Sequence, residues 1–572
     1  MTNQESSFEK NRVDVLVVGA GPTGVTAAAE ARRHGLSVRI IDKNNARSPY
    51  SRALVVHSRT LELFSDMGLI WRVLERGREF RALNIYVDQK PISRIVFHEL
   101  DWQDAPYPFW LSIPQSDTEL CLTEHLSGHG VEIERQTEIS GLTQHSDFVS
   151  VELQRADGRT ETCEASWVVG CDGARSDVRR LLGIDFHGTT DDEVFILADV
   201  TLETVLTDAE GHNFMAAGGI GIIVPMCKPG HVRLIFHMPN LHPSDKPAIT
   251  QTMLQSLLDE RTGQATRIVD VGWTSQFSVK HFVAERHRQG RVFLAGDAAH
   301  IHSPVGGQGL NTGIQDAYNL MWKLALFHKG QGSAALLDSY ETERHAVAEE
   351  TIKNVRRATT MMTLRHPISQ ELRNQIAGML MNTDMVKNRM GHSVGMLNLN
   401  YENSPVIGDD VPATSFLSKI ARRLLPGDSY DFGDGPEAGD LAPSLEVVNA
   451  NGARASLLDV MRGPHHSLLI FMGAGGSGET NAWGAALAEL RLRYDAVIHP
   501  ILIEHERMAG GTHIPNFDGS LLRDTEGKIH RRYGAHVPCL YLVRPDKYVA
   551  YRCPMIDFKR VMAYLDRILV AK

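Results

Sequence analysis

Three short apolar runs, rich in β-branched residues, each lead directly into a turn that contains glycine. The runs cover residues 13–18, 167–170 and 291–295, and the turns that follow read GAGPTG (19–24), CDGARS (171–176) and GDAAH (296–300). An uninterrupted apolar run of this kind is typical of a parallel strand that is buried on both faces. The pattern therefore predicts three strand–turn units that come from distant parts of the chain.

The first unit continues into a predicted helix over residues 25–34. Gly19 allows the tight turn, Gly21 lets the backbone approach a pyrophosphate, and Gly24 lets the helix pack closely on the strand. The N-terminus of the helix presents unpaired N–H groups and a partial positive charge to phosphates. A second predicted strand ends at Asp42, where a carboxylate would bind the two hydroxyls of a ribose. This unit predicts a site for FAD or NAD and does not distinguish between them.

A second glycine-rich segment, PVGGQGLNTG at residues 304–313, follows the third unit and leads into a predicted helix from about Ile314. Such an entry directs a helix N-terminus at a bound group that becomes anionic. A reduced flavin ring carries its negative charge near N1 and the C2 carbonyl, so this arrangement favours a flavin. Asp297 is placed to accept hydrogen bonds from ribityl or ribose hydroxyls. The three units together predict an FAD-binding oxidoreductase.

Composition narrows the possible partners and the compartment. The formal net charge of −10 and the lack of a dense basic segment argue against a nucleic-acid partner. The six cysteines are scattered without a CxxC pair, which predicts reduced thiols, a cytoplasmic location and no zinc site. The polar N-terminus predicts no secretory signal, and glycines with Pro22 interrupt the apolar run over 13–29, so no membrane-spanning segment is expected. No spacing typical of a metal site stands out.

The motifs resemble those of the class A, single-component FAD monooxygenases typified by para-hydroxybenzoate hydroxylase and phenol hydroxylase. The matching segments span roughly residues 13–345 and are GAGPTG, CDGARS, GDAAH, Ser51-Arg52-Ala53 ahead of Arg59-Thr60-Leu61-Glu62, and Ile113-Pro114-Gln115. The resemblance implies a flavoprotein that uses NADH or NADPH and O₂. In such an enzyme a flavin C4a-hydroperoxide hydroxylates a phenolic or related aromatic substrate.

The resemblance also implies roles for individual residues. Arg52 and Gln115 would contact FAD, Asp172 would bridge the flavin and NAD(P)H regions, and Asp297 would bind the ribityl-phosphate side. Pro304 would lie near the flavin ring and the substrate. The residues expected to bind the cofactor are Gly19, Gly21, Pro22, Thr23, Gly24, Asp42, Lys43, Arg52, Gln115, Asp172, Gly296, Asp297, Gly307, Gly309, Leu310 and Asn311.

A general base that deprotonates the phenol would make the ring more nucleophilic. Phenol hydroxylase has an aspartate shortly after the arginine that Arg52 resembles, whereas this chain has Leu54 there, so the resemblance assigns no base. His57 is the first candidate because histidine titrates in the suitable range, although a lone histidine in an apolar run is more often structural. The alternatives are His237, His212, Tyr86 and Tyr107.

The expected fold class is α/β, and the chain is predicted to have four parts. They are a Rossmann-like FAD-binding domain (1–80, 111–186 and 283–345), an inserted mixed β-sheet that forms the substrate pocket (81–110 and 187–282), a helical segment and linker (346–438), and a thioredoxin-like domain (439–572). A single helical stretch is expected from Ile314 to about Leu380, and Pro538 would be the cis-proline of the thioredoxin-like fold. Where the thioredoxin-like fold that this part resembles keeps its redox cysteines, the chain has GAGGSG at 473–478, so this domain would be structural or form a homodimer.

Two other functions remain open. A Baeyer–Villiger or epoxidising flavin monooxygenase would share these motifs, and a non-catalytic FAD-binding protein would keep the cofactor site alone. A dithiol reductase would need a CxxxxC pair near the first motif, and the chain has none there. The sequence does not indicate which aromatic compound is the substrate, or whether NADH or NADPH is used.

Overall fold

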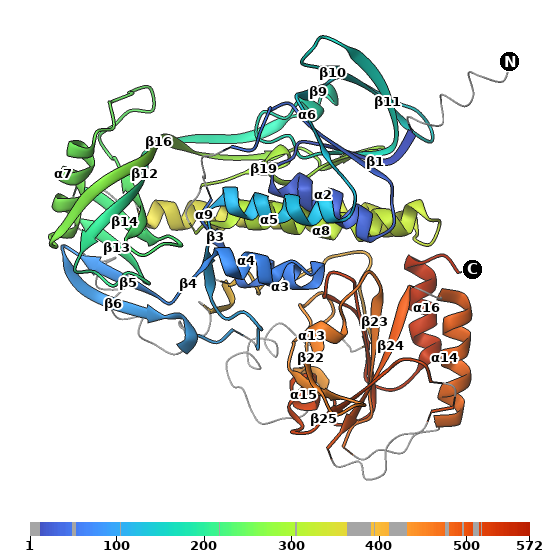
Figure 1. Cartoon of the computed structure of the whole chain (residues 1–572). Coiled ribbons are helices and arrows are strands. Elements are labelled where there is room, and N and C mark those ends of the chain that lie inside the picture. Colours follow the sequence, from blue (N-terminus) through green and yellow to red (C-terminus); the bar gives the residue numbers. More distant parts are fainter. Residues whose placement is uncertain are drawn as a thin grey trace.

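The strands form three large sheets: the first two draw on alternating segments of the chain, and the third is formed by its C-terminal part (Figure 1). The computed structural model describes residues 12–48, 53–102, 104–216, 218–303, 306–362, 391–393, 395–410, 432–474, 480–494, 497–506, 514–515 and 517–571. Within these residues there are three eight-stranded sheets and a small sheet of three strands. The small sheet consists of β3 (Val55–Val56), β4 (Arg78–Phe80) and β7 (Trp110–Ser112).

The first sheet contains the three predicted strand–turn units as parallel neighbours, in the order β18-β11-β1. Residues Val15 to Val18 of β1 are buried and contribute alternately to the clusters on the two faces of the sheet. This burial explains the uninterrupted apolar runs. The strands of this sheet are β1 (Arg12–Val18), β2 (Val38–Asp42), β8 (Ile133–Arg135), β9 (Thr137–Gln144), β10 (Val149–Arg155), β11 (Thr160–Gly170), β17 (Arg288–Gln289) and β18 (Val292–Leu294).

Helices α2 (Pro22–Arg33), α5 (Gln115–Gly128), α8 (Gln308–His328) and α9 (Ala334–Met362) run beside one another below the first sheet (Figure 1). Helix α2 begins three residues before the predicted start, because a proline in the first turn has no N–H to lose. The single stretch expected from Ile314 is wrong. It is divided into α8 and α9 by a turn at Gly330, which has a φ of +69°. The predicted end near Leu380 lies outside the described residues.

The second sheet lies beside the first, and α7 (Gln251–Thr262) covers its outer face (Figure 1). Its longest strands, β12 and β16, pair along most of their length. Strand β16 also pairs with β19, which follows the GDAAH turn, so the second sheet is hydrogen-bonded to the third predicted unit. The strands are β5 (Ala82–Val87), β6 (Lys90–Val96), β12 (Phe186–Thr204), β13 (Gly211–Ala216), β14 (Gly219–Pro225), β15 (His231–His237), β16 (Thr266–Ala284) and β19 (His300–Ile301).

The C-terminal part of the chain forms the third sheet, with α14 (Thr480–Tyr494) and α16 (Phe558–Ile568) on one side (Figure 1). The expected cis peptide bond at Pro538 is wrong, because no cis peptide bond occurs among the described residues. Instead, the trans segment packs beside the turn after β23, where the Ala474 N–H donates to the His536 carbonyl at 3.0 Å. The strands are β20 (Gly408–Asp409), β21 (Glu446–Asn449), β22 (Arg454–Ser456), β23 (His466–Phe471), β24 (Ile498–His505), β25 (Ser520–Asp524), β26 (Cys539–Val543) and β27 (Val549–Cys553).

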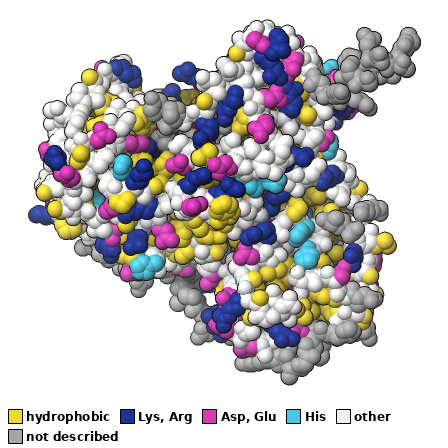
Figure 2. Space-filling view, viewed as in Figure 1, with side chains coloured by type: hydrophobic (Ala, Val, Ile, Leu, Met, Phe, Trp, Pro, Cys, Tyr) yellow, Lys and Arg dark blue, Asp and Glu magenta, His cyan; other side chains and the backbone are white. Residues whose placement is uncertain are grey.

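Acidic and basic side chains are interspersed over the face of the molecule shown in Figure 2. This mixture is consistent with a formal net charge of −10 spread over 128 charged residues, 59 basic and 69 acidic. In the part of the chain that the structure describes, no helix is long and apolar enough to cross a membrane.

A buried turn between β26 and β27 fixes the third sheet to α8 and α9. Arg544 donates to the two carboxylate oxygens of Glu343 at 2.7 and 2.9 Å, and Lys323 donates to Glu343 at 2.6 Å. Arg544 also donates to Asp546 at 2.8 Å. Burial alone would raise the pKa of Glu343, but Arg544 and Lys323 hold it below its ordinary value. The carboxylate therefore stays ionised inside the protein.

Replacing Arg544 with methionine leaves the buried Glu343 carboxylate with Lys323 as its remaining basic partner. We expect Arg544→Met to cost about 3–5 kcal/mol of the free energy of unfolding. The control is Arg454→Met, because the Arg454–Glu446 side chains are 70% and 57% exposed and their pair is worth less than about 1 kcal/mol. Urea unfolding followed by tryptophan fluorescence measures both. Equal effects of the two substitutions would contradict the structural importance of the buried turn.

Candidate functional site

The three glycine-containing turns lie side by side at one edge of the first sheet. Because β1, β11 and β18 are parallel neighbours, their carboxyl ends meet at the same edge. The Cys171 N–H donates to the Val18 carbonyl at 2.7 Å, and the Ala295 N–H donates to the Gly170 carbonyl at 3.0 Å, so the pairing extends to the start of the turns. In open α/β sheets, ligands bind at this edge.

Two glycines of the first turn stand where backbone segments are in direct contact. A Cβ atom at Gly19 would lie 2.4 Å from the Cys171 carbonyl oxygen, and one at Gly24 would lie 1.9 Å from the Gly19 carbonyl oxygen. Neither position accepts a side chain without a shift of the backbone. At Gly21, by contrast, no described protein atom lies within 4 Å of the position of a Cβ. These surroundings fit the predicted division between two packing glycines and one that faces a ligand.

Thr23 in the first turn of α2 connects two further glycine segments. A Cβ at Gly296 would lie 2.5 Å from the Thr23 hydroxyl oxygen, and a Cβ at Gly313 would lie 2.3 Å from the same atom. The Gly296 residue also has a φ of +61°, which favours glycine. Thr23 therefore holds the GAGPTG turn, the GDAAH turn and α8 together. Pro22, which precedes it, begins α2.

Two helices begin at this edge without a capping side chain. Helix α2 has Gly21 at its N-cap, and α8 has Gly307 there, and neither cap position has a side-chain hydrogen bond to the described helix. The first N–H groups of an α-helix have no partner within the helix. Both N-termini can therefore donate hydrogen bonds to an anionic or polar ligand. Gly309 and Leu310 lie in the first turn of α8, and Leu310 also packs against the core of the first sheet.

A buried carboxylate on α8 fixes the GDAAH turn. Asp316 accepts hydrogen bonds from the Gly296 N–H at 2.9 Å, from His300 Nε2 at 2.7 Å and from Arg344 Nε at 2.6 Å. Burial alone would raise the pKa of Asp316, but Arg344 and His300 hold it below its ordinary value. Asp316 was not among the residues predicted from the sequence. The available signal was an acid on the apolar face of α8, between Ile314 and Ala317.

Asp42, at the end of β2, is tied to the first turn. One carboxylate oxygen accepts from the Ala20 N–H at 2.8 Å, and the other accepts from the backbone and side-chain nitrogens of Asn44 at 2.8 and 2.9 Å. A carboxylate has about four acceptor positions, so these three bonds leave capacity for a ribose hydroxyl. Lys43 is exposed and pairs with Asp177 at 3.5 Å.

Asp172 and Asp297 occupy the other two turns in different ways. Asp172 caps α6 (Asp177–Leu181), accepting from the Ser176 hydroxyl at 2.5 Å and from the backbone N–H of Asp177 at 2.6 Å. Burial raises the pKa of Asp172. Asp297 is exposed, although Gly296 and Ala298 on either side are buried. The exposed carboxylate on a buried turn is the expected geometry for a ligand contact.

Asn311 and His57 connect α8 to the segment around β3. The Asn311 side chain accepts from the His57 N–H at 2.9 Å and donates to the Val55 and Gly307 carbonyls at 2.9 and 2.8 Å. His57 Nε2 lies 2.9 Å from the Gly306 carbonyl oxygen. Because a carbonyl only accepts, this nitrogen carries the proton. Both side chains therefore hold the glycine loop before α8, and a base role for His57 stays a prediction.

Gln115 begins α5 and contacts the chain next to Arg52. Its side-chain oxygen accepts from the Ala53 N–H at 3.3 Å, and its nitrogen donates to Glu119 at 2.8 Å. Arg52 and Pro304 lie outside the described residues, so their predicted roles stay predictions.

The alternative bases are dispersed over the structure. Tyr86 and His212 share a hydrogen bond of 3.1 Å. His237 contacts the carboxylate of Glu193. Tyr107 packs against the core cluster of the first sheet.

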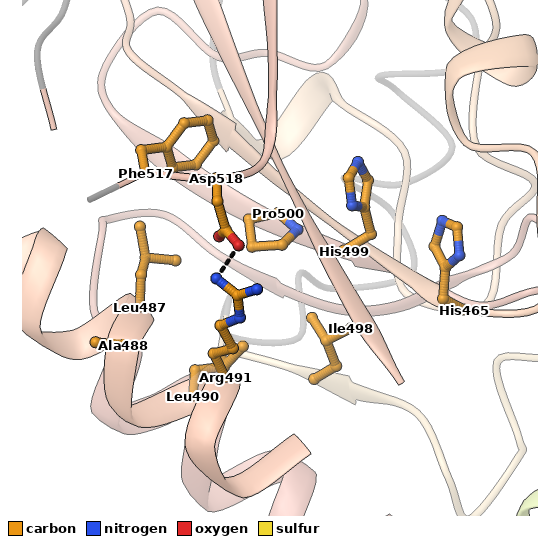
Figure 3. A pocket seen from close by; sticks show the side chains of 10 residues that line it. All are labelled: His465, Leu487, Ala488, Leu490, Arg491, Ile498, His499, Pro500, Phe517 and Asp518. Atoms are coloured by element: carbon orange, nitrogen blue, oxygen red, sulfur yellow. Dashed lines mark ion pairs between the residues drawn. The ribbon is translucent and has the colours of Figure 1, made fainter. Parts of the chain in front are cut away.

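A separate cavity of about 410 Å³ lies at the third sheet, between α14 and β24 (Figure 3). Arg491 and Asp518 form an ion pair at this cavity. No residue of the three turns lines it. Its lining residues are His465, Leu487, Ala488, Leu490, Arg491, Ile498, His499, Pro500, Phe517 and Asp518. Among the residues that the structure describes, no group of three or more His, Cys, Asp or Glu side chains is arranged to hold a metal ion.

The chain is similar in sequence and fold to known proteins. The family described as "FAD binding domain" matches residues 12–355. The 6-methylpretetramide 4-monooxygenase of Streptomyces rimosus is 33% identical over 554 residues, covering 95% of this chain and 91% of that protein. Pentachlorophenol 4-monooxygenase of Sphingobium chlorophenolicum is 28% identical over 570 residues, covering 97% and 96%. The solved ternary complex of aklavinone-11 hydroxylase with FAD and aklavinone has a TM-score of 0.74 and 26% identity, covering 97% of this chain and 98% of that chain.

The family match covers more than half of the chain, and these relatives align with nearly all of it. The predicted α/β fold class and the predicted FAD cofactor are confirmed by these matches. The chain belongs to the FAD-dependent aromatic hydroxylases, the class A flavoprotein monooxygenases.

Proposed function

We propose that this chain hydroxylates a phenolic or related aromatic compound, with NADH or NADPH as the electron donor and O₂ as the oxygen source. The observation that supports this most directly is the meeting of three glycine turns and two uncapped helix N-termini at one sheet edge. Relatives named 6-methylpretetramide 4-monooxygenase and pentachlorophenol 4-monooxygenase align with 95% and 97% of the chain. When bound, FAD supplies the redox chemistry and the activation of oxygen, and the protein binds, orients and excludes water.

The first and third turns and two helix N-termini have proposed contacts with different parts of FAD. Gly21 and the N-terminus of α2 would bind the pyrophosphate, and Asp42 the adenosine ribose. The exposed carboxylate of Asp297 would accept hydrogen bonds from the ribityl side. The N-terminus of α8 would stabilise negative charge on the reduced ring, because its uncapped N–H groups and helix dipole favour an anion. Arg52, Gln115 and Pro304 would complete the site.

The four-part division of the chain and the role of its last part also belong to this proposal. We infer that residues 439–572 form a thioredoxin-like domain without redox chemistry. Its buried thiols Cys539 and Cys553 support this, because burial raises the pKa of each thiol and disfavours the reactive thiolate. A homodimer in the cytoplasm is the expected state of the enzyme.

Asp297→Ala tests the cofactor contact without disturbing the core, because this side chain is exposed. A hydrogen bond to a charged group is worth about 1.5–3 kcal/mol, so we expect FAD affinity to fall by roughly 10- to 100-fold. The control is Asp270→Ala, which removes an exposed carboxylate from β16. Titration of the FAD-free protein with FAD, followed by flavin fluorescence, measures both. Equal affinities for the two variants would refute the Asp297 contact.

A panel of phenols tests the reaction itself. We expect a suitable phenol to accelerate NAD(P)H oxidation at least about tenfold, since the flavin of an aromatic hydroxylase is reduced productively when substrate is present. In ¹⁸O₂ the product should gain one labelled oxygen atom on the ring, detected by mass spectrometry. A ring-expanded lactone formed from a cyclic ketone that is tested beside the phenols would indicate the Baeyer–Villiger alternative. An FAD-loaded protein that gives neither acceleration nor product with a broad panel would indicate a non-catalytic FAD protein.

A further inference from the structure

The second sheet has two faces that differ in their surroundings. Ile196, Leu234 and Phe236 belong to the buried cluster under α7. Side chains alternate along a strand, so the residues between them point to the opposite face, which we call the inner face. On this face Ile222 and Ile235 are only partly buried, although both are apolar. The inner face therefore presents accessible apolar surface.

His237 ends β15 on the inner face. It pairs with Phe195 on β12, and Phe195 pairs with Phe277 on β16. Five residues farther along β16, Phe282 pairs with Ile301, which directly follows the GDAAH turn. At about 3.3 Å per residue, Phe277 and Phe282 are roughly 17 Å apart along β16. His237 therefore lies on the inner face beside the middle of β12, and β16 continues from there to its pairing with β19 at the GDAAH turn.

Aromatic rings accompany the imidazole. The Phe195 and Phe277 rings are stacked, with centroids 5.6 Å apart and an interplanar angle of 13°. The His237 ring lies 5.1 Å from the Phe195 ring. Offset or tilted ring contacts of this kind are favourable for aromatic groups. An aromatic substrate on the inner face would find a ring surface beside a proton acceptor.

A carboxylate contacts the imidazole. Glu193 lies at the β-bulge of β12 between Thr190 and Val194, and its Oε2 is in hydrogen-bond contact with His237 Nε2. Bulges redirect side chains near active sites. The His237 side chain is 3% exposed and that of Glu193 is 19% exposed. An ionised carboxylate only accepts, so Nε2 carries a proton, and the carboxylate stabilises the imidazolium that forms when the ring takes up a second proton.

We propose that His237, supported by Glu193, is the general base that deprotonates the hydroxyl group of the aromatic substrate. This proposal rests on the proposed hydroxylation. The substrate O–H bond breaks and an Nδ1–H bond forms, while the electron pair stays on the phenolate oxygen and activates the ring. The imidazolium later releases the Nδ1 proton to water, which restores the neutral base, while Nε2 keeps its proton toward Glu193.

The other candidate bases do not share the surroundings of His237 on the inner face. Tyr86 packs with the outer cluster and hydrogen-bonds to His212, whose Nε2 lies 3.1 Å from the Thr207 carbonyl. His57 Nε2 donates to a backbone carbonyl. The nearest described charged groups on the inner face are themselves paired: Arg233 with Asp199 at 2.7 Å, and His281 with Asp191 at 3.4 Å. On the outer side, Arg261 of α7 pairs with Glu260 at 2.8 Å.

The test compares two phenols with the FAD-loaded enzyme. For a weakly acidic phenol, His237→Gln should lower kcat for hydroxylation by about 100-fold or more and remove the fall in rate at low pH. For a nitro-substituted phenol that is already ionised at the assay pH, the same variant should retain a rate within a few-fold of the unmodified enzyme. Glu193→Gln, at a partly exposed position, should lower kcat for the weakly acidic phenol by about tenfold. It should leave the rate with the nitro-substituted phenol within a few-fold of the unmodified enzyme. The control His212→Gln should show none.

The outcomes separate this proposal from the proposed function. If the unmodified enzyme hydroxylates neither phenol, the proposed function fails. If it hydroxylates both and His237→Gln loses the same factor with each, His237 has a structural role and the base assignment is overturned. Should His237→Gln not fold with FAD, as judged by circular dichroism and flavin absorbance, the Glu193→Gln variant decides by the same comparison.

Discussion

Close contact between backbone segments at the carboxyl edge of the first sheet is the constraint on which the rest of this structure depends. Gly19 and Gly24 bring the first turn against Cys171, and Gly296 brings the third turn against Thr23. A side chain at any of the three glycines would separate the segments. Because they stay together, two helix N-termini are directed at one place, and a single extended dinucleotide can contact all three motifs.

Buried charges extend this constraint to the C-terminal part of the chain. Asp316 holds the GDAAH turn and pairs with Arg344, which donates to the Tyr401 hydroxyl at 2.9 Å. The guanidinium of Arg544, from the third sheet, lies 5.0 Å from the centre of the Tyr401 ring and pairs with Glu343. Breaking buried pairs of this kind is costly. The third sheet is thus joined through buried contacts to the helices that hold the GDAAH turn.

The sequence was sufficient for features that depend on local pattern, and insufficient for those that depend on distant partners. Apolar runs and glycines predicted the three strand–turn units, because burial on both faces and tight turns leave a local signature. Asp316 and Arg544 were missed, because their importance comes from partners that the fold brings together. The break at Gly330 did have a local signal, the polar segment HKGQGS at residues 328–333 with its two glycines, and the expected long helical stretch ignored it. His57 was the first candidate base, and the pattern gave no sign that its Nε2 also contacts the glycine loop before α8.

Hydrogen–deuterium exchange of the FAD-free and FAD-loaded protein tests the central claim, the convergence of three motifs on one cofactor. Peptides covering residues 19–24, 171–176 and 296–300 should all exchange more slowly when FAD is added, and with the same dependence on FAD concentration. Peptides of the exposed hairpin around Gly158 should not change. Protection of the first motif alone, or protection of the three at different FAD concentrations, would contradict a single shared site.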